Sequence, residues 1–555
     1  MNLHLLNIAL WFLPYAQVTG LGLLLLKLLR FEFKRPRDVL RAFWAGFAGL
    51  IACLQLTHFF WPVNFPVVLS LMFLSALGFI MAGRDGVRLL TNLKFKDLLF
   101  IIVAAGIVHA WVLSQKAVVP VRYDTGLYHI QQIDWLMRHP TVVGLGNLFT
   151  NLAFPQVYFF FAAFLERAYA GMGGCYMASY ILAAAVLFEC ALGARAIIVK
   201  ADLRVQNFFR VLLFLPFIFY ACYDSRVVTA SPDAAVFLIE LAMTALLFDV
   251  LEDLPGCPLA FFVYIFMTFI GIALKPSYAI FGAAGLVLAG WRGRGRLRGW
   301  WFVLIGACVL VPFFIRNIML SGYLFFPSSF MPFPVDWRIP AFIQDGNLAC
   351  TLSYAKAGDC QARALGDLGW LGFWLKDGIR GASGFFNVPL GLIFFGCLFG
   401  VRKVFKAPVI AVLLPPVISF TVIFFTAPDC RFFGSSVWII GLVLAAAVFA
   451  GEGVLLKFLP VKGLVLVLVV LFGLMSARGA WSAVALKRYI PVDRGHYKVF
   501  RLSDAVSVLQ LQGDDRCWGT SLPCTPHRIG ALKLRDPRHI EAGFTRQGDR
   551  EDMTP

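Results

Sequence analysis

Charged residues are scarce in this sequence. Only 14% of its 555 residues are Asp, Glu, Lys or Arg, whereas about a quarter of the residues in a soluble domain are charged. The mean hydropathy is +0.79. Apolar runs of roughly 17 to 25 residues recur along the chain, and each is long enough to cross a hydrocarbon core of about 30 Å. The short alternating segments of a membrane β-barrel are absent. The composition therefore predicts an all-α polytopic membrane protein.

The motifs of several common enzyme classes are also missing. The sequence contains no Walker loop, no H-E-x-x-H, no G-x-S-x-G and no paired C-x-x-C motif. ATP hydrolysis, zinc proteolysis and classical serine hydrolysis are therefore not expected. The net charge of +18 does not indicate nucleic-acid binding, because most basic residues lie in short turns between apolar runs, where they set orientation in the membrane.

The apolar runs predict about fourteen transmembrane helices. We expect them at residues 5–29, 39–61, 66–83, 97–115, 177–199, 205–222, 233–251, 257–273, 276–291, 299–317, 386–402, 407–427, 432–450 and 462–481. The first run is too long for a signal-peptide core and is interpreted as a retained helix. Turns rich in Lys and Arg, such as "WRGRGRLRGW", should be cytoplasmic, which places both termini outside.

This threading divides the chain into six parts. They are N-terminal helices (1–115), a first large extracytoplasmic loop (116–176), a transmembrane core (177–317), a second extracytoplasmic loop (318–385), C-terminal helices (386–481) and a small extracytoplasmic tail (482–555). One proposed cytoplasmic turn, "FDVLEDLPGC", carries no Lys or Arg and fits the orientation rule least well.

The first outer loop is expected to hold two juxtamembrane helices. Residues 152–170 are apolar, but Pro155, Glu166 and Arg167 suit an interfacial position better than a crossing. The alternative, that this segment spans the membrane and another span is missed, stays open. Residues 127–136 alternate apolar and polar side chains with helical spacing, so we expect a helix in the interface plane with its apolar side in lipid.

Two close cysteine pairs lie on the predicted outer side. Cys350 with Cys360, and Cys517 with Cys524, are predicted to form disulfides because that side is oxidising. A zinc site at the second pair would need two further ligands, which His527 alone does not supply, so no metal site is predicted. Trp518, beside this pair, is expected to pack on the outer surface, with binding of a sugar ring as the alternative.

Polar residues gather at the predicted outer ends of the spans. The stretch "YDTGLYHIQQIDWL", residues 123–136, is the richest in them. The candidate substrate-binding residues are Arg122, Asp233, Lys275, Arg316, Asp336, Arg338, Asp429 and Arg431, and the candidate catalytic residues are Asp124 and His129. Solvated surface charge is the alternative for any one of them. Their recurrence at helix ends, in a chain whose spans hold few charges, favours a shared extracytoplasmic pocket.

A carboxylate beside cations at the level of lipid phosphates suits sugar transfer from a polyprenyl-phosphate donor. Asp124 would act as general base on the acceptor hydroxyl. Lys275, Arg316 and Arg431 would stabilise the phosphate leaving group. The structural alternatives are that Asp124 caps a helix and that His129 is a packed interfacial side chain.

These features resemble the membrane glycosyltransferases of the GT-C class. The resemblance covers mainly residues 97–300 and depends on an outer Asp soon after a span, an interfacial helix, and a span ending in "ARAIIVK". It implies a catalytic acid in the first large outer loop, a lipid-linked sugar donor with a glycan acceptor, and no other cofactor. Here the acidic loop follows the fourth span rather than the first, and Asp124 lacks a D-x-D partner. A metal-free mechanism is therefore favoured, although a divalent metal is not excluded.

The motifs "GLGNL", "SPDAAVFLIE", "SGYLFFP", "APDCRFFG" and "CWGTSLPCTP" also resemble a bacterial family of uncharacterised polytopic membrane proteins, along nearly the whole chain. This implies a multi-pass protein of the bacterial inner membrane with a periplasmic active face. The rival functions are a membrane transporter or flippase, a polysaccharide polymerase or ligase acting on lipid-linked glycans, and an assembly protein. No internal repeat of the kind many transporters carry is evident.

Overall fold

The structure is a computed structural model. It describes residues 3–91, 94–115, 123–169, 173–221, 229–252, 258–292, 300–358, 368–378, 383–404, 407–450, 470, 473, 496–513, 515–526 and 530–546. The predicted span 462–481 therefore lies almost entirely outside the described residues, as do Arg122 and Cys360.

Long apolar helices make up most of the fold. Within the described residues, six helices are long and apolar enough to cross a membrane: α2 (Pro36–Thr57), α3 (Phe65–Thr91), α8 (Gly174–Ile198), α11 (Pro232–Glu252), α14 (Trp300–Ser321) and α19 (Ala407–Thr426). The protein is thus a helical membrane protein, as its composition predicts. By this criterion six helices qualify in the described residues, and the prediction of about fourteen spans stays a prediction.

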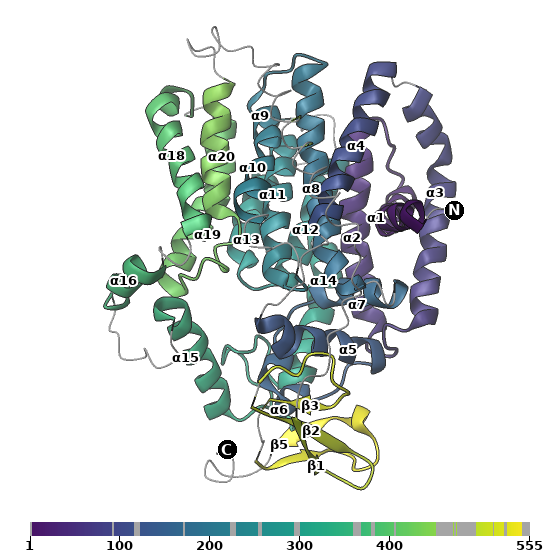
Figure 1. Ribbon diagram of the computed structural model, residues 1–555, viewed down its shortest axis with the longest axis vertical. Helices are drawn as coiled ribbons and strands as arrows, with labels where there is room; N and C mark the ends of the chain where they lie inside the picture. Colours follow the sequence, from purple (N-terminus) through teal and green to yellow (C-terminus); the bar gives the residue numbers. More distant parts are fainter. Residues whose placement is uncertain are drawn as a thin grey trace.

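The bundle contains further helices that are not among these six candidates in the residues that were described. They are α1 (Leu3–Leu28), α4 (Phe95–Gln115), α9 (Val205–Leu212), α10 (Phe214–Pro216) with the π-turn η3 (Phe217–Ala221), α12 (Pro258–Leu274), α13 (Tyr278–Arg292), α18 (Ser383–Val404) and α20 (Ser436–Phe449). Figure 1 shows α1–α4 on one side of the bundle, α8–α14 in its centre and α18–α20 on the other side.

Small residues bring α1 and α2 into close contact. A Cβ atom added at Gly22 would lie 1.7 Å from the backbone oxygen of Ala42, and one added at Gly46 would lie 1.8 Å from that of Val18. Any larger side chain at either glycine would push the two helices apart. Such small-residue contacts are the usual way in which membrane helices approach each other closely.

Residues 123–169 form a compact layer at one end of the bundle. It contains the π-turn η1 (Thr125–His129), α5 (Ile130–Arg138), α6 (Leu145–Leu148), the 3-10 turn η2 (Thr150–Ala153) and α7 (Tyr158–Ala168). Helix α7 has 11 residues, a length of about 16 Å, so it is too short to cross a membrane. This length favours the prediction that 152–170 does not span the membrane.

The expected lipid contacts of this layer are wrong. Residues 158–165 of α7 are completely buried. In α5, the apolar Ile133 and Leu136 are buried, and so are the polar Gln131 and Gln132. Both sides of α5 are therefore covered by protein, and it packs against α7. The alternating sequence pattern records two protein contacts of different polarity, not one face in lipid and one in water.

The C-terminal half adds elements beyond the bundle. Helix α15 (Ala341–Ala357), α16 (Trp370–Phe373) and the π-turn η5 (Trp374–Gly378) lie in the predicted second outer loop. The tail forms five short strands, which an all-α fold does not include: β1 (His496–Arg501), β2 (Ser507–Gln512), β3 (Cys524–Thr525), β4 (Leu532–Leu534) and β5 (Phe544–Arg546), with the 3-10 turn η6 (Ile540–Ala542).

These strands build two small sheets. The strand order of the first is β1-β2-β3, with β1 antiparallel to β2 from His496 opposite Gln512 to Arg501 opposite Ser507, and with β2 parallel to β3. The second pairs β4 with β5 in antiparallel register. In Figure 1 the strands, drawn in yellow, lie directly beside α5 and α6 at the end of the bundle.

A buried network of ion pairs surrounds Asp249, near the C-terminal end of α11. Asp249 accepts hydrogen bonds from Arg210 at 2.7 Å and Arg41 at 3.0 Å. Arg41 also donates to Asp38 at 2.8 Å, and Arg210 to Glu189 at 2.9 Å. The acidic turn that fits the orientation rule poorly thus has its counter-charges on other helices.

Candidate functional site

The turn between α19 and α20 holds two of the predicted site residues. Asp429 Oδ1 accepts the backbone N–H of Arg431 at 2.8 Å, which closes a tight local turn. The guanidinium of Arg431 returns to the same carboxylate, with Nη2 at 3.0 Å and Nε at 3.2 Å from Oδ2. This internal pair fixes the direction of the Arg431 side chain.

Glu240 of α11 holds this turn in place through two hydrogen bonds from Ser435. Its Oε2 accepts the backbone N–H of Ser435 at 2.6 Å and the Ser435 hydroxyl at 3.1 Å. Gly434 has a φ of +55°, and a Cβ there would lie 2.4 Å from Glu240 Oε2. Glycine is therefore required both by the backbone conformation and by the close carboxylate.

Asp124 meets Arg431 across 307 residues of sequence. Arg431 Nη1 donates to Asp124 Oδ2 at 3.1 Å, and both side chains are about one-third exposed. Asp124 precedes the π-turn η1 and makes no side-chain capping hydrogen bond. Its carboxylate is thus used for the contact with Arg431, and not for a helix cap. The contact brings together two of the charges that the sequence places at predicted outer helix ends.

Lys275 joins the same group. It lies between α12 and α13, forms an ion pair with Asp233 at the start of α11, and sits 4.6 Å from the centre of the Phe432 ring. Burial, and then the charge of Arg431, lower the pKa of Lys275 to about 7, against the opposing effect of Asp429 and Asp124. The five residues Asp124, Asp233, Lys275, Asp429 and Arg431 are called the Asp124 cluster below.

Positive and negative charges in the Asp124 cluster nearly balance. It combines three carboxylates with two cations, and each cation is already paired with a carboxylate. Burial raises the pKa of Asp429, but the attraction and hydrogen bonds of Arg431 outweigh it, so the pKa ends below its usual value. An incoming phosphate would therefore have to exchange with a carboxylate in order to reach Arg431 or Lys275.

His129 lies beside this cluster but is enclosed by aromatic rings. Its side chain is 1% exposed, and its ring centre is 4.4 Å from that of Tyr128 and 5.3 Å from that of Phe159. Burial, with the charges of Lys275 and Arg431, lowers its pKa to about 3. The imidazole is thus neutral at ordinary pH, and its surroundings are those of a packed side chain.

Three other predicted residues are not part of the cluster. Asp336 pairs with Arg535 of the tail at 2.8 Å, and exposed Arg338 donates to the backbone oxygen of Phe333 at 3.3 Å. Arg316 is buried in a different place, against the ring of Phe160. Residue Arg122 lies outside the described residues. Across the described parts of the chain, no three His, Cys, Asp or Glu side chains are grouped as metal ligands.

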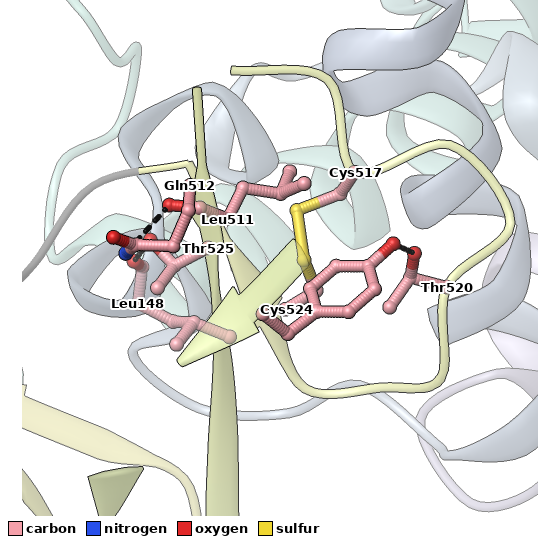
Figure 2. The surroundings of a disulfide bond; sticks show 8 residues. Leu148, Leu511, Gln512, Cys517, Thr520, Cys524 and Thr525 are labelled. Atoms are coloured by element: carbon pink, nitrogen blue, oxygen red, sulfur yellow. Dashed lines mark hydrogen bonds between the residues drawn. A yellow bond between two sulfur atoms is a disulfide. The ribbon is translucent and has the colours of Figure 1, made fainter. Parts of the chain in front are cut away.

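The tail packs against the segment that carries Asp124. Figure 2 shows the disulfide between Cys517 and Cys524, which confirms the predicted pair. Cys350 is also disulfide-bonded, while its predicted partner Cys360 lies outside the described residues. The loop between Cys517 and Cys524 begins with Trp518, whose backbone N–H donates to Gly126 O at 2.9 Å.

Trp518 touches Gly126 directly. A Cβ at Gly126 would lie 2.5 Å from Trp518 Cε2, so only glycine leaves room for the indole. Further along, Thr525 contacts Leu148 and the Phe544 backbone N–H donates to Val143 O at 2.9 Å. The tail therefore covers part of residues 123–169, and Trp518 has the packing role expected of it.

Sequence reasoning missed Glu240 as the anchor of the 428–435 turn and missed the Asp249 network. The only signal available was an acidic residue inside an apolar run, which is costly in a membrane unless it has a partner. Nothing in the sequence identified that partner, because Ser435 lies 195 residues from Glu240 and Arg41 lies 208 residues from Asp249.

Comparison with protein families gives one match. A model described as "Domain of unknown function (DUF8201)" matches residues 4–438, which is more than half of the chain and includes the whole Asp124 cluster. No curated protein and no solved structure matches the chain.

Proposed function

The chain belongs to the DUF8201 family, and from this starting point we propose that it is an integral membrane glycosyltransferase of the GT-C type. It would transfer a sugar from a polyprenyl-phosphate-linked donor to a cell-envelope glycan or lipid acceptor. The contact between Asp124 and Arg431 is the observation that supports this most strongly. A carboxylate next to two cations can combine a general base with stabilisation of a phosphate leaving group.

In this proposal the Asp124 cluster faces the extracytoplasmic side of a bacterial inner membrane, and the protein has about fourteen spans. Two observations support the orientation. Turns rich in Lys and Arg are typical of the cytoplasmic side. The disulfide between Cys517 and Cys524 belongs to the tail that covers Gly126, and disulfides persist in oxidising compartments. A reporter fused after Pro140 should be extracytoplasmic, and one at 292–298 cytoplasmic.

The resting ion pair explains how the base would be released. Arg431 holds Asp124 through Nη1 while Nε and Nη2 hold Asp429. A donor phosphate that takes over Nη1 would free the Asp124 carboxylate beside the bound sugar. The guanidinium would stay aligned, because Asp429 continues to hold its other nitrogens.

The transfer then needs one proton movement and one substitution. Asp124 accepts the proton of the acceptor hydroxyl as the acceptor oxygen bonds to the anomeric carbon. The bond from that carbon to the phosphate oxygen breaks, and polyprenyl phosphate leaves with the bonding electron pair. Arg431 and protonated Lys275 stabilise the charge that develops on the phosphate.

The test uses Asp124→Asn, with Asp336→Asn as the matched control. Asp336 is also an outer carboxylate paired with an arginine, but it lies outside the cluster. In cells that lack the chromosomal gene, we expect the wild type and Asp336→Asn to restore the envelope glycans, and Asp124→Asn to lower transfer by about 10²- to 10⁴-fold. Normal glycans with well-expressed Asp124→Asn would remove Asp124 from the mechanism.

Purified protein allows a second test of the same site. Binding of undecaprenyl phosphate, measured by native mass spectrometry, should weaken in Lys275→Ala. The melting temperature in detergent reports the accompanying loss of the ion pair with Asp233, and binding should be altered more than folding. Equal binding by the two proteins would exclude Lys275 as a phosphate ligand.

A transporter or flippase is the second candidate, and the Asp249 network favours it. Charged groups inside the membrane region often mark a substrate or proton pathway. Such a protein would move a lipid-linked glycan across proteoliposomes without covalent transfer. Counterflow in that assay, unchanged by Asp124→Asn, would favour the transporter.

A further inference from the structure

Arg316 is a buried cation with no ion-pair partner among the described residues. It lies in α14, its side chain is 4% exposed, and its Nε and Nη1 atoms have no hydrogen-bond partner. None of the carboxylates in the described residues forms an ion pair with it. Among the described residues, the Phe160 ring lies 5.2 Å from the guanidinium and favours its charge. A buried charge is normally paired, because burial without a counter-charge is costly.

Arg316 lines a small hollow together with other polar side chains. The hollow lies between α14, the end of α2, α5 and residues 140–152, and has room for about one water-sized group. Three of its lining residues also present buried polar atoms with no hydrogen-bond partner: Nε2 of His58, Oε1 of Gln132 and Nε1 of Trp135. These three side chains are at most 3% exposed.

Contacts on their other atoms fix two of these side chains. His58 Nδ1 is 2.9 Å from Thr141 Oγ1, and Gln132 Nε2 donates to Asn151 O at 3.1 Å. Their free atoms are therefore held in position rather than left mobile. Burial, and then the charge of Arg316, lower the pKa of His58 to about 3, so the imidazole neither adds to nor offsets the charge of Arg316.

We propose that this hollow is an anion site, distinct from the Asp124 cluster, in which Arg316 and the Trp135 indole N–H hold one oxygen of a phosphate group. Water could accept these hydrogen bonds, but it would leave the positive charge uncompensated. Gln132 Oε1 is an acceptor, and it therefore suits a phosphate whose one oxygen inside the hollow carries a hydroxyl hydrogen. The size of the hollow admits a single oxygen, with the rest of the ligand outside it.

This site is separate in its chemistry from the proposed sugar transfer. The cations of the Asp124 cluster already have carboxylate partners, whereas Arg316 has none. The ligand could be free phosphate or the phosphomonoester of a lipid headgroup. Since the site does not depend on glycosyltransferase activity, it can be tested by binding alone.

The experiment measures the melting temperature of the full-length protein in maltoside, at constant ionic strength set with gluconate. Inorganic phosphate is titrated in one arm and phosphatidic acid in the other. We expect a rise that grows with the logarithm of concentration above the Kd. A response to inorganic phosphate identifies a soluble ligand, and a response to phosphatidic acid alone identifies a lipid ligand; both support the site.

Three variants decide the outcome. Arg316→Met should raise the apparent Kd by at least about tenfold, and Trp135→Phe, which keeps the ring packing, by about threefold. Arg338→Gln removes an exposed arginine at the same end of the protein and should respond as the wild type does. The site is refuted if neither ligand stabilises the wild type, or if Arg316→Met keeps the full response.

Discussion

Asp249 offers the sharpest test of how the helical bundle is held together. Its side chain is 3% exposed and contacts Arg210 at 2.7 Å, Arg41 at 3.0 Å and Arg37 at 3.5 Å. With Asp38 and Glu189, the network contains three arginines and three carboxylates and is therefore neutral. Asp249→Asn keeps the size of the side chain and leaves one uncompensated buried positive charge.

The size of the effect follows from burial. Removing one partner of a buried ion pair costs about 3–5 kcal/mol. Here Arg41 keeps Asp38 and Arg210 keeps Glu189, so we expect the lower end, about 3 kcal/mol. The control is Asp202→Asn, whose partner Arg204 is half-exposed. Such a pair contributes at most about 1 kcal/mol.

The assay is unfolding of the purified protein by SDS in mixed micelles, followed by tryptophan fluorescence. A double variant, Asp249→Asn with Arg37→Gln, restores neutrality and should recover part of the lost free energy of unfolding. If Asp249→Asn were no more costly than Asp202→Asn, the network would not stabilise the bundle, and the reasoning from burial would be wrong.

Three further predictions concern the end of the protein that carries the Asp124 cluster and the tail. Because the pKa of Lys275 is lowered from its usual value to about 7, the unfolded chain binds more protons than the folded one between about pH 7 and 10.5, so stability should rise with pH there. The slope from this residue is at most about 1.4 kcal/mol per pH unit, and Lys275→Met should lose it in pH-dependent unfolding. Gly126→Ala should displace Trp518 and cost about 1–3 kcal/mol, with faster proteolysis of the tail. Gly346→Ala should not, because a Cβ added there meets no described atom of another element within 4 Å. Replacing Cys517 by Ser should likewise speed tail proteolysis without changing the melting of the bundle, and unchanged proteolysis would contradict a fastening role for the disulfide.

The charged residues next to the apolar runs show how much of the candidate site local sequence can predict. Asp124, Asp233, Lys275, Asp429 and Arg431 are identifiable because each follows or precedes an apolar run, and the structure brings these five together. The same criterion also selected Arg316, Asp336 and Arg338, which lie elsewhere. Position at a helix end predicts the layer in which a charge lies, but it does not predict its neighbours within that layer.

The helix of residues 130–138 shows a second limit. Its alternating polarity predicts an amphipathic helix, and the helix exists. Amphipathic spacing is the same whether the apolar face meets lipid or another helix. Only the tertiary structure, in which α5 packs against α7 and other elements, decides that Ile133 and Leu136 are buried by protein.

The sequence by itself determined the helical membrane class, the gathering of charges outside the apolar runs and the pairing of Cys517 with Cys524, because hydropathy and close spacing are local properties of the chain. The tertiary structure alone decided that Asp124 meets Arg431 and that Asp249 is neutralised by arginines of other helices. It also decided that Arg316 has no counter-charge within the described parts of the chain. These outcomes depend on which helices pack side by side, and contacts across hundreds of residues leave no periodic signal in one sequence.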